Sequence, residues 1–173
     1  PLLARYYRLL GLTRRTENFS KLRSHQIIPL LGDLDQQASL KRLSGIADAI
    51  IHLAPPPNMG LKDTRTRHLL AALSRQHSRA KGRIPHRLVY ISTSGVYGDR
   101  DGQWVGEHNP VKPRNDRAWR RFDAECQIRK WGTDTGSNVT ILRVPGIYAI
   151  DRLPIARLKQ GTPALLEKED SYT

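Results

Sequence analysis

The chain has 173 residues, of which 38% are hydrophobic, and this is enough for one domain with a well-packed core. Its single cysteine, Cys126, excludes an intramolecular disulfide and argues against a cysteine-based metal cluster. No apolar run reaches the roughly 18 residues that a membrane span needs, and the lack of an export signal favours a reducing, cytoplasmic setting without membrane contact. The formal net charge of +13 is spread over several segments, and no zinc finger, RNP motif or basic zipper accompanies it. We therefore favour an arginine-rich composition of the source organism, or attraction to phosphorylated ligands, over nucleic-acid binding.

Five continuous apolar runs predict the β-strands of the chain. In chain order they are Tyr7–Arg14, Gln26–Asp33, Asp48–Ala54, Arg87–Thr93 and Asn138–Val144. Apolar residues that run on without alternating with polar ones are typical of parallel strands.

Helical segments alternate with these strands. They cover Leu34–Gly45, Asp63–Gln76, Asn115–Gly132 and Arg152–Gly161. We expect Asp63 to cap the second, and Gly132 to end the third. Trp119, Phe122 and Cys126 are predicted to form one apolar stripe of that third helix, with Cys126 a small buried hydrophobe. Strands alternating with helices predict an α/β fold, a Rossmann-type doubly wound parallel sheet with helices on both faces.

A hydroxyl-rich turn follows the fourth predicted strand, in the string VYISTSGVYGD (Val89–Asp99). This string resembles the fifth strand of extended short-chain dehydrogenases/reductases, in the branch of NAD-dependent epimerases and dehydratases. Aligned on Val-Tyr-Gly, Thr93 takes the family's catalytic Ser/Thr position, with Ser94 beside it, and such a hydroxyl can donate to a substrate oxygen. The alternative is an ordinary Ser/Thr turn after a strand.

Two further strand ends resemble the cofactor-binding segments of the same family. The string HLAPPPN (His52–Asn58) resembles the end of its fourth strand, which implies cofactor contacts from Leu53, Ala54 and Pro55, while His52 is expected to be a packed strand residue. The string ILRVPGIYA (Ile141–Ala149) resembles the sixth strand, which implies that Pro145, Gly146 and Ile147 shape the nicotinamide end.

The first two predicted strands correspond to the family's second and third. Arg14 and Arg15 close the first, where arginines can hold a 2′-phosphate, so NADP is slightly favoured over NAD; a solvated basic loop is the alternative. Asp33 and Leu34 follow the second, where the family places an Asp near the adenine, although Asp33 could equally be a turn or cap residue.

The catalytic helix departs from the family pattern. The family carries Tyr-x-x-x-Lys with a Glu four residues later, and alignment on Glu125 places Arg117 at the tyrosine and Arg121 at the lysine position. Arginine stays charged and cannot shuttle the proton. Arg121 is still expected to bind the cofactor ribose or a phosphate.

The family's opening strand and Gly-rich loop are not present, so we expect residues upstream of Pro1, a gap in the sheet, and a domain that is incomplete at both ends. The resemblance divides the chain into an NAD(P)-binding domain, residues 1–150, and the start of a C-terminal substrate-binding region, residues 151–173.

Three functions stay open. The first is an NAD(P)-dependent epimerase, dehydratase or other oxidoreductase acting on a nucleotide-sugar-like molecule. The second is a non-catalytic NAD(P)-binding sensor or partner-binding module, and the third, more remote, is a basic nucleic-acid-binding domain. The resemblance also implies a homodimer formed through the helix that contains Trp119 and Trp131.

Overall fold

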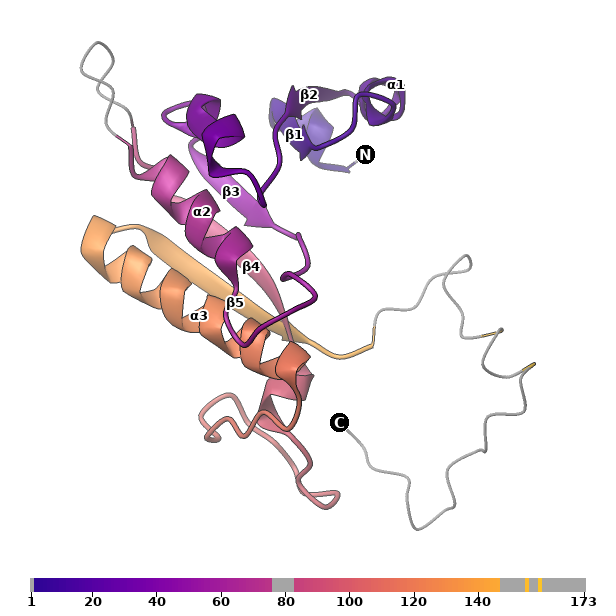
Figure 1. Ribbon diagram of the computed structural model, residues 1–173, viewed down its shortest axis with the longest axis vertical. Helices are drawn as coiled ribbons and strands as arrows, with labels where there is room; N and C mark the ends of the chain where they lie inside the picture. Colours follow the sequence, from indigo (N-terminus) through magenta and orange to yellow (C-terminus); the bar gives the residue numbers. More distant parts are fainter. Residues whose placement is uncertain (1, 76–82, 147–154, 156–158, 160–173) are drawn as a thin grey trace.

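The computed structural model describes residues 2–75 and 83–146 and the single residues 155 and 159. Its strands form two parallel sheets. One pairs β1 (Leu9–Thr13) with β2 (Ile27–Leu31), and the other has the order β3 (Ala49–His52), β4 (Arg87–Thr93) and β5 (Asn138–Val144). All five predicted strands are confirmed. No strand of the described part joins β1 to β3, which confirms the predicted gap (Figure 1).

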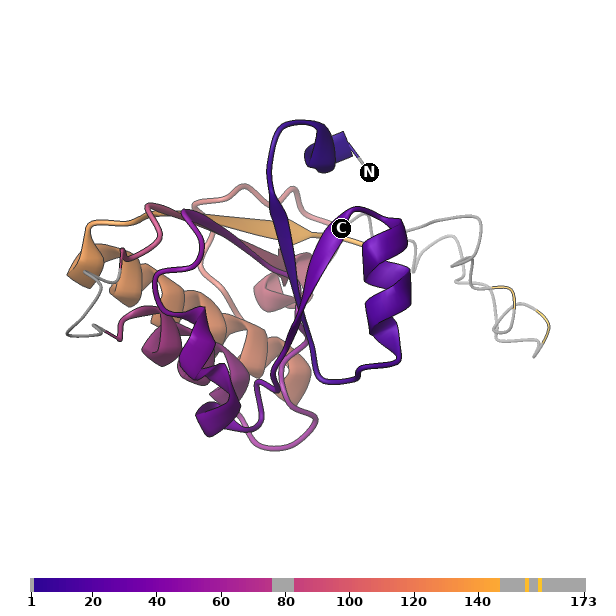
Figure 2. The same ribbon diagram turned by 90° about the horizontal axis from the view of Figure 1, so that it is seen from above.

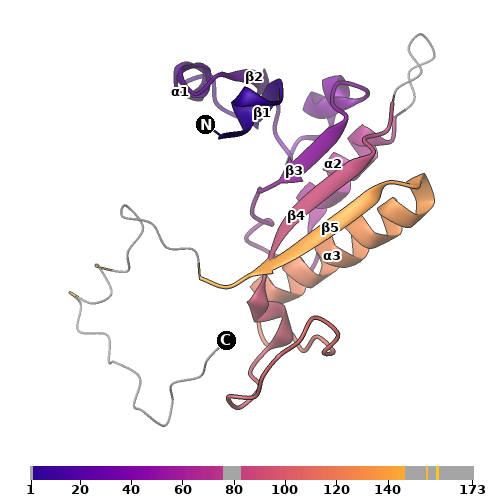
Figure 3. The ribbon, with the colours of Figure 1, turned by 180° about the vertical axis from the view of Figure 1, so that it is seen from behind.

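Two α-helices cover the same face of the β3–β4–β5 sheet: α2 (Thr64–Leu73) and α3 (Asp116–Thr135) (Figure 1). Leu88, Tyr90 and Ser92 alternate along β4 as buried residues that point toward these helices. The core cluster joins Leu88 and Tyr90 to side chains of the helices and of the preceding turn: Leu40, Leu43, Leu69, Leu70, Ala72, Leu73, Ala124, Ile128 and Trp131. The opposite face carries no helix in the described part of the chain (Figure 3).

Side-chain caps begin both long helices. The Asp63 carboxylate accepts the Thr66 backbone N–H at 3.0 Å, as predicted, and the Asn115 side chain accepts the Ala118 N–H at 2.9 Å. The predicted end of α3 at Gly132 is wrong. The helix continues to Thr135 and ends at Gly136, which has a left-handed φ of 71°.

The remaining helical turns are short. They are η1 (Leu2–Arg5), α1 (Asn18–Ser24) beside β1 and β2, η2 (Gln37–Leu43) and η3 (Ser94–Tyr97) (Figure 2). The predicted first helix is the 3-10 helix η2, and Gln36 before it makes no side-chain cap hydrogen bond. The predicted segment Arg152–Gly161 lies outside the continuously described residues.

The predicted apolar stripe of α3 is also wrong. Cys126 is exposed rather than buried, and Trp119 is 44% exposed and packs edge-to-face on Phe122. The face on the sheet instead includes Ala124, Glu125, Ile128 and Trp131. Each residue turns the helix by about 100°, so one position moves Cys126 away from the core face that Glu125 occupies.

No helix of the described segments is long and apolar enough to cross a membrane.

Candidate cofactor and active site

Apart from Arg121, which lies on α3, the predicted site residues that the structure describes lie at or just after the carboxyl ends of parallel strands. Register pairs Thr13 with Leu31 and Thr93 with Val144 at the carboxyl ends of their strands, whereas β3 ends at His52, which pairs with Tyr90, three residues before the end of β4. In open α/β sheets ligands bind outside these ends. Arg14 and Arg15 follow β1, Asp33 and Leu34 follow β2, Leu53, Ala54 and Pro55 follow β3, Thr93 and Ser94 end β4 and begin η3, and Pro145 and Gly146 follow β5. Ile147 lies outside the described residues.

Thr93 is half-buried at the last position of β4. Its backbone is extended, and its Oγ1 accepts the Gly95 N–H at 3.2 Å. This bond uses an acceptor site of the hydroxyl and leaves its proton to be donated, since no acceptor for that proton occurs among the described residues. Thr93 therefore both caps the turn and keeps one hydrogen bond for a ligand.

The glycine of the Val-Tyr-Gly string has a backbone explanation. Gly98 has φ 71°, and a Cβ there would overlap the carbonyl oxygen of Lys112. Val96 and Tyr97 before it are buried. The turn after Thr93 is thus fixed by packing and by one glycine.

A buried carboxylate lies beneath this turn. Glu125 of α3 is fully buried, accepts the Ser92 hydroxyl at 2.6 Å, and receives Nη2 of Arg143 at 2.7 Å and its Nε at 3.1 and 3.2 Å. The Arg143 guanidinium in turn lies 4.6 Å from the Tyr97 ring centroid. These four residues, the Glu125 network, connect α3, β4, η3 and β5 directly beside Thr93.

Arg121 binds to β4 through one of its terminal nitrogens. Nη1 donates to the Tyr90 hydroxyl and to the Ile91 carbonyl, both at 3.0 Å, and the guanidinium stands over the Tyr90 ring at 5.6 Å. The Nε and Nη2 groups have no acceptor among the described residues, so they can serve a ligand. Arg117, one turn earlier, is exposed.

Tyr90 does not replace the missing catalytic tyrosine. Burial raises the pKa of Tyr90 to about 12, although Arg121 acts in the opposite direction. The phenol therefore stays protonated near neutral pH and donates or accepts hydrogen bonds without exchanging its proton readily.

His52 is a packed strand residue, as predicted. It is 3% exposed, stacks on Tyr90 at 5.2 Å, and its Nε2 lies 2.9 Å from the Thr66 hydroxyl. That hydroxyl donates to the Asp63 carboxylate at 2.8 Å, so His52 must donate to Thr66 through Nε2. Burial, with Arg121 adding to it, lowers the pKa of His52 to about 4, and the ring is neutral.

Asp33 shapes the loop after β2 through two hydrogen bonds. Its carboxylate accepts the Asp35 N–H at 2.9 Å, and its own N–H donates to the Ser39 hydroxyl at 2.8 Å. Asp33 is thus a turn residue, which was the structural alternative for this position. The next residue, Leu34, presents its carbonyl oxygen to Nδ1 of His68 at 2.7 Å.

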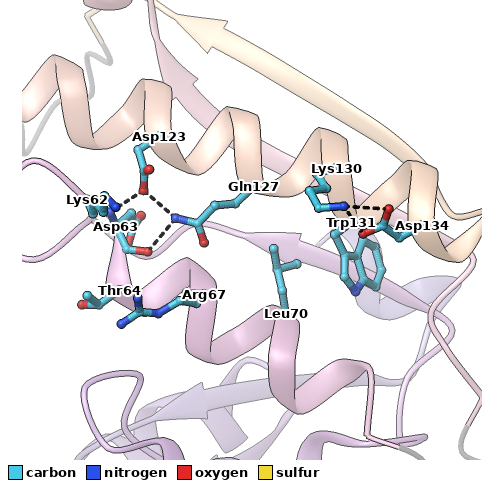
Figure 4. Close-up of a pocket in the computed structure, with 10 residues that line it drawn as sticks. All are labelled: Lys62, Asp63, Thr64, Arg67, Leu70, Asp123, Gln127, Lys130, Trp131 and Asp134. Atoms are coloured by element: carbon cyan, nitrogen blue, oxygen red, sulfur yellow. Dashed lines mark hydrogen bonds and ion pairs between the residues drawn. The ribbon is translucent and has the colours of Figure 1, made fainter.

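A groove lies elsewhere, between α2 and α3. Asp63 and Gln127 line one end, Leu70 lies in its middle, and Trp131 lies at the other end with the ion pair of Lys130 and Asp134 (Figure 4). None of the predicted site residues lines it. We therefore place the candidate site at the strand ends, where the groups with ligand chemistry gather.

Comparison with known proteins identifies the family of the chain. A family model described as the NAD dependent epimerase/dehydratase family matches residues 1–155. UDP-glucuronic acid 4-epimerase from Bacillus cereus, in complex with NAD, is 20% identical with a TM-score of 0.68, over 92% of this chain and 57% of that one. A dTDP-glucose 4,6-dehydratase from Streptomyces venezuelae, with NAD bound, is 21% identical with a TM-score of 0.64, over 88% and 52%.

A third similar structure is RMD from Pseudomonas aeruginosa, complexed with NADPH. It is 26% identical with a TM-score of 0.61, over 91% of this chain and 63% of that one. The chain therefore spans 52% to 63% of the length of these three proteins. Curated protein sequences give no match.

Proposed function

Because the chain belongs to the NAD-dependent epimerase/dehydratase family, we propose that it is an epimerase, dehydratase or other oxidoreductase that binds NADP or NAD and acts on a nucleotide-sugar-like molecule. Two of the similar structures have the names of enzymes of UDP- and dTDP-sugars, which supports this substrate class. The observation that carries the proposal is the position of the Thr93 hydroxyl, which keeps a proton to donate at the end of β4. We place the protein in the cytoplasm.

The cofactor would lie across the ends of the five strands. Arg14 and Arg15 are exposed without an ion pair in the described part of the chain, and they fit a 2′-phosphate, so we propose a preference for NADP. Asp33 and Leu34 would approach the adenine, and residues 53–55 the ribose and pyrophosphate. Residues 145–147 would shape the nicotinamide end, and Arg121 would bind the ribose or a phosphate. Residues 1–150 would form the cofactor domain and residues 151–173 the start of the substrate-binding region.

The cofactor supplies the hydride acceptor and donor, and the residues of the chain bind and orient. Thr93, helped by Ser94, would polarise a substrate oxygen by hydrogen bonding. Arg117 and Arg121 remain charged and do not shuttle the proton. They would instead stabilise negative charge on the ligands, and the acid or base of the reaction is a different group.

The same substitution favours a second function. With arginines at both positions of the catalytic dyad, the protein would bind the cofactor without turning it over, as a sensor or partner-binding module. Fold alone does not choose between enzyme and sensor, because the chemistry resides in the site.

We also propose a homodimer through α3. Trp119 and Cys126 of α3 are both exposed. Replacing Trp119 by Asp should then shift full-length protein to a monomer in sedimentation experiments. A wild-type protein that is already monomeric at micromolar concentration would contradict the proposal.

The enzymatic proposal is tested by incubating full-length protein with NADP or NAD and a panel of UDP- and dTDP-sugars. Sugar products are separated and identified, because an epimerase returns its hydride and leaves no net change in nicotinamide absorbance. Conversion of one sugar supports the enzyme. Tight cofactor binding without any conversion favours the sensor.

A further inference from the structure

We propose that Arg65 is a positioning residue of the cofactor site, which fastens the loop after β2 to the loop after β3 and so holds the surface for the adenosine half of the cofactor. This inference rests on the proposed function, since it assigns a role in binding the same cofactor. Arg65 lies in the first turn of α2 and follows neither strand directly.

The contact with the loop after β2 is a bidentate ion pair. Arg65 Nε donates to Asp35 Oδ1 and Nη2 donates to Asp35 Oδ2, both at 2.7 Å. The two parallel hydrogen bonds match the planar guanidinium to the planar carboxylate, a geometry that fixes direction as well as distance. Asp35 belongs to the turn that Asp33 organises through the Asp35 N–H. Arg65 therefore holds the loop that contains Asp33 and Leu34.

The contact with the loop after β3 uses the remaining nitrogen. Arg65 Nη1 donates to the Pro55 carbonyl at 3.1 Å and lies 3.4 Å from the Pro56 carbonyl oxygen. Proline has no N–H, so this segment can be held through its backbone only by donors that reach its carbonyls. An arginine on the neighbouring helix supplies those donors.

The Arg65 side chain is largely shielded from solvent, which strengthens its hydrogen bonds. The Arg65 side chain is 20% exposed and that of Asp35 is 40% exposed. The hydrogen-bonded pair also shifts both groups toward their charged forms, lowering the pKa of Asp35 and raising that of Arg65. One turn along the same helix, His68 contacts the Leu34 carbonyl. Two residues of α2 thus bind the loop after β2.

This connection bridges the two sheets. Among the described strands, β2 and β3 belong to different sheets. Arg65 contacts both loops at once. We infer that the relative position of residues 33–34 and 53–55, and with it the affinity for adenosine-bearing ligands, depends on this side chain.

The experiment measures binding of ADP-ribose to full-length protein by calorimetry. The variants are Arg65→Ala, Asp35→Ala and the double variant. A matched control is Arg83→Ala, which removes an Arg–Asp pair with Asp48 at the opposite, amino end of β3, where both side chains are largely exposed. Urea unfolding of each ligand-free protein shows that the temperature chosen leaves all of them folded.

We expect each single variant to weaken ADP-ribose binding about tenfold, the scale of one charge-assisted hydrogen-bonded pair. The double variant should bind as the singles do, because both remove the same connection, and Arg83→Ala should bind like the wild type. Unchanged binding in Arg65→Ala, or effects that multiply in the double variant, would overturn the inference while leaving the proposed function intact. Wild-type protein that binds no ADP-ribose would overturn both.

Discussion

Arg143 of β5 holds the fully buried carboxylate of Glu125 on α3 with two nitrogens, at 2.7 Å from Nη2 and 3.1 Å from Nε. The pair lies directly beneath the end of β4, where Ser92 donates to the same carboxylate. Its geometry is that of a bidentate hydrogen-bonded ion pair, and its burial makes each partner dependent on the other.

Replacing Arg143 by Leu should therefore destabilise the protein strongly. The change leaves the Glu125 carboxylate buried without its principal counter-charge, which costs about 3–5 kcal/mol of unfolding free energy. Urea unfolding measures this cost. As a control, Lys130→Ala breaks the exposed pair of Lys130 with Asp134 and should cost only about 0.3–0.5 kcal/mol. Equal effects of the two variants would show that Glu125 is not held as described.

His52 makes stability depend on pH in a defined window. Its pKa is about 4 in the folded protein and 6.5 in the unfolded chain, so the unfolded chain binds more protons between these values. The contribution of His52 to the free energy of unfolding is fully present above pH 6.5 and is lost as the pH falls toward 4. The total loss is about 3 kcal/mol. His52→Phe keeps a ring against Tyr90 and removes the titration.

The measurement for His52 is the free energy of unfolding at several pH values across that window. The stability advantage of the wild type over His52→Phe should shrink as the pH falls from 6.5 toward 4. A pH-independent effect of His52→Phe would mean that the ring is not neutral and buried in solution.

Two glycines near the end of α3 should respond to alanine for different reasons. A Cβ at Gly132 would lie 2.7 Å from Val139 Cγ1, so Gly132→Ala overpacks the contact of α3 with β5, at about 1–3 kcal/mol. Gly136 meets no atom within 4 Å but has φ 71°, so Gly136→Ala costs about 1 kcal/mol of backbone strain. Adding Val139→Ala should relieve the clash of Gly132→Ala but not the strain of Gly136→Ala; equal behaviour in unfolding experiments would contradict this distinction.

Cofactor preference depends on the two arginines after β1. Replacing Arg14 and Arg15 together by Ala should weaken NADPH binding by about 1.5–3 kcal/mol, the cost of losing hydrogen bonds to a charged group. NADH binding should change little, because NADH has no 2′-phosphate. Arg8→Ala, before the amino end of β1, is the control. Titrations in which the double variant retains the wild-type ratio of the two affinities would remove the basis for the preference.

The sequence predicts the strands well because each is a local, continuous apolar run. The buried face of α3 was predicted wrongly, since the sequence placed Cys126 in the core whereas the structure places the charged Glu125 there. A buried Glu is only stable with partners, and its partners Ser92 and Arg143 are 33 and 18 residues away. The role of Arg65 could not be predicted for the same reason, because its partner Asp35 lies 30 residues away in the chain. A charged residue in register with an apolar helix face is the one signal that could have indicated Glu125.

The site residues are predicted from the family resemblance and from their positions at the ends of strands. Parallel pairing places the carboxyl ends at one edge of each sheet, so the position of the site residues could be predicted from the strands alone. The roles could not, because hydrogen bonds such as that of the Gly95 N–H to Thr93 arise from turns that the sequence does not specify. These roles stay predictions.

Turnover by Thr93 variants tests the central claim most directly, that this hydroxyl faces the substrate at a cofactor site. In full-length protein, Thr93→Val should lower turnover about 10²–10³-fold, the loss expected for one donor to a developing charge, with nearly unchanged affinity for the cofactor. Thr93→Ser, which retains the hydroxyl, should keep most of the activity, and Thr133→Val, on the exposed side of α3, should keep all of it. Wild-type turnover in Thr93→Val, or a loss of cofactor affinity that accounts for the lost activity, would contradict the account.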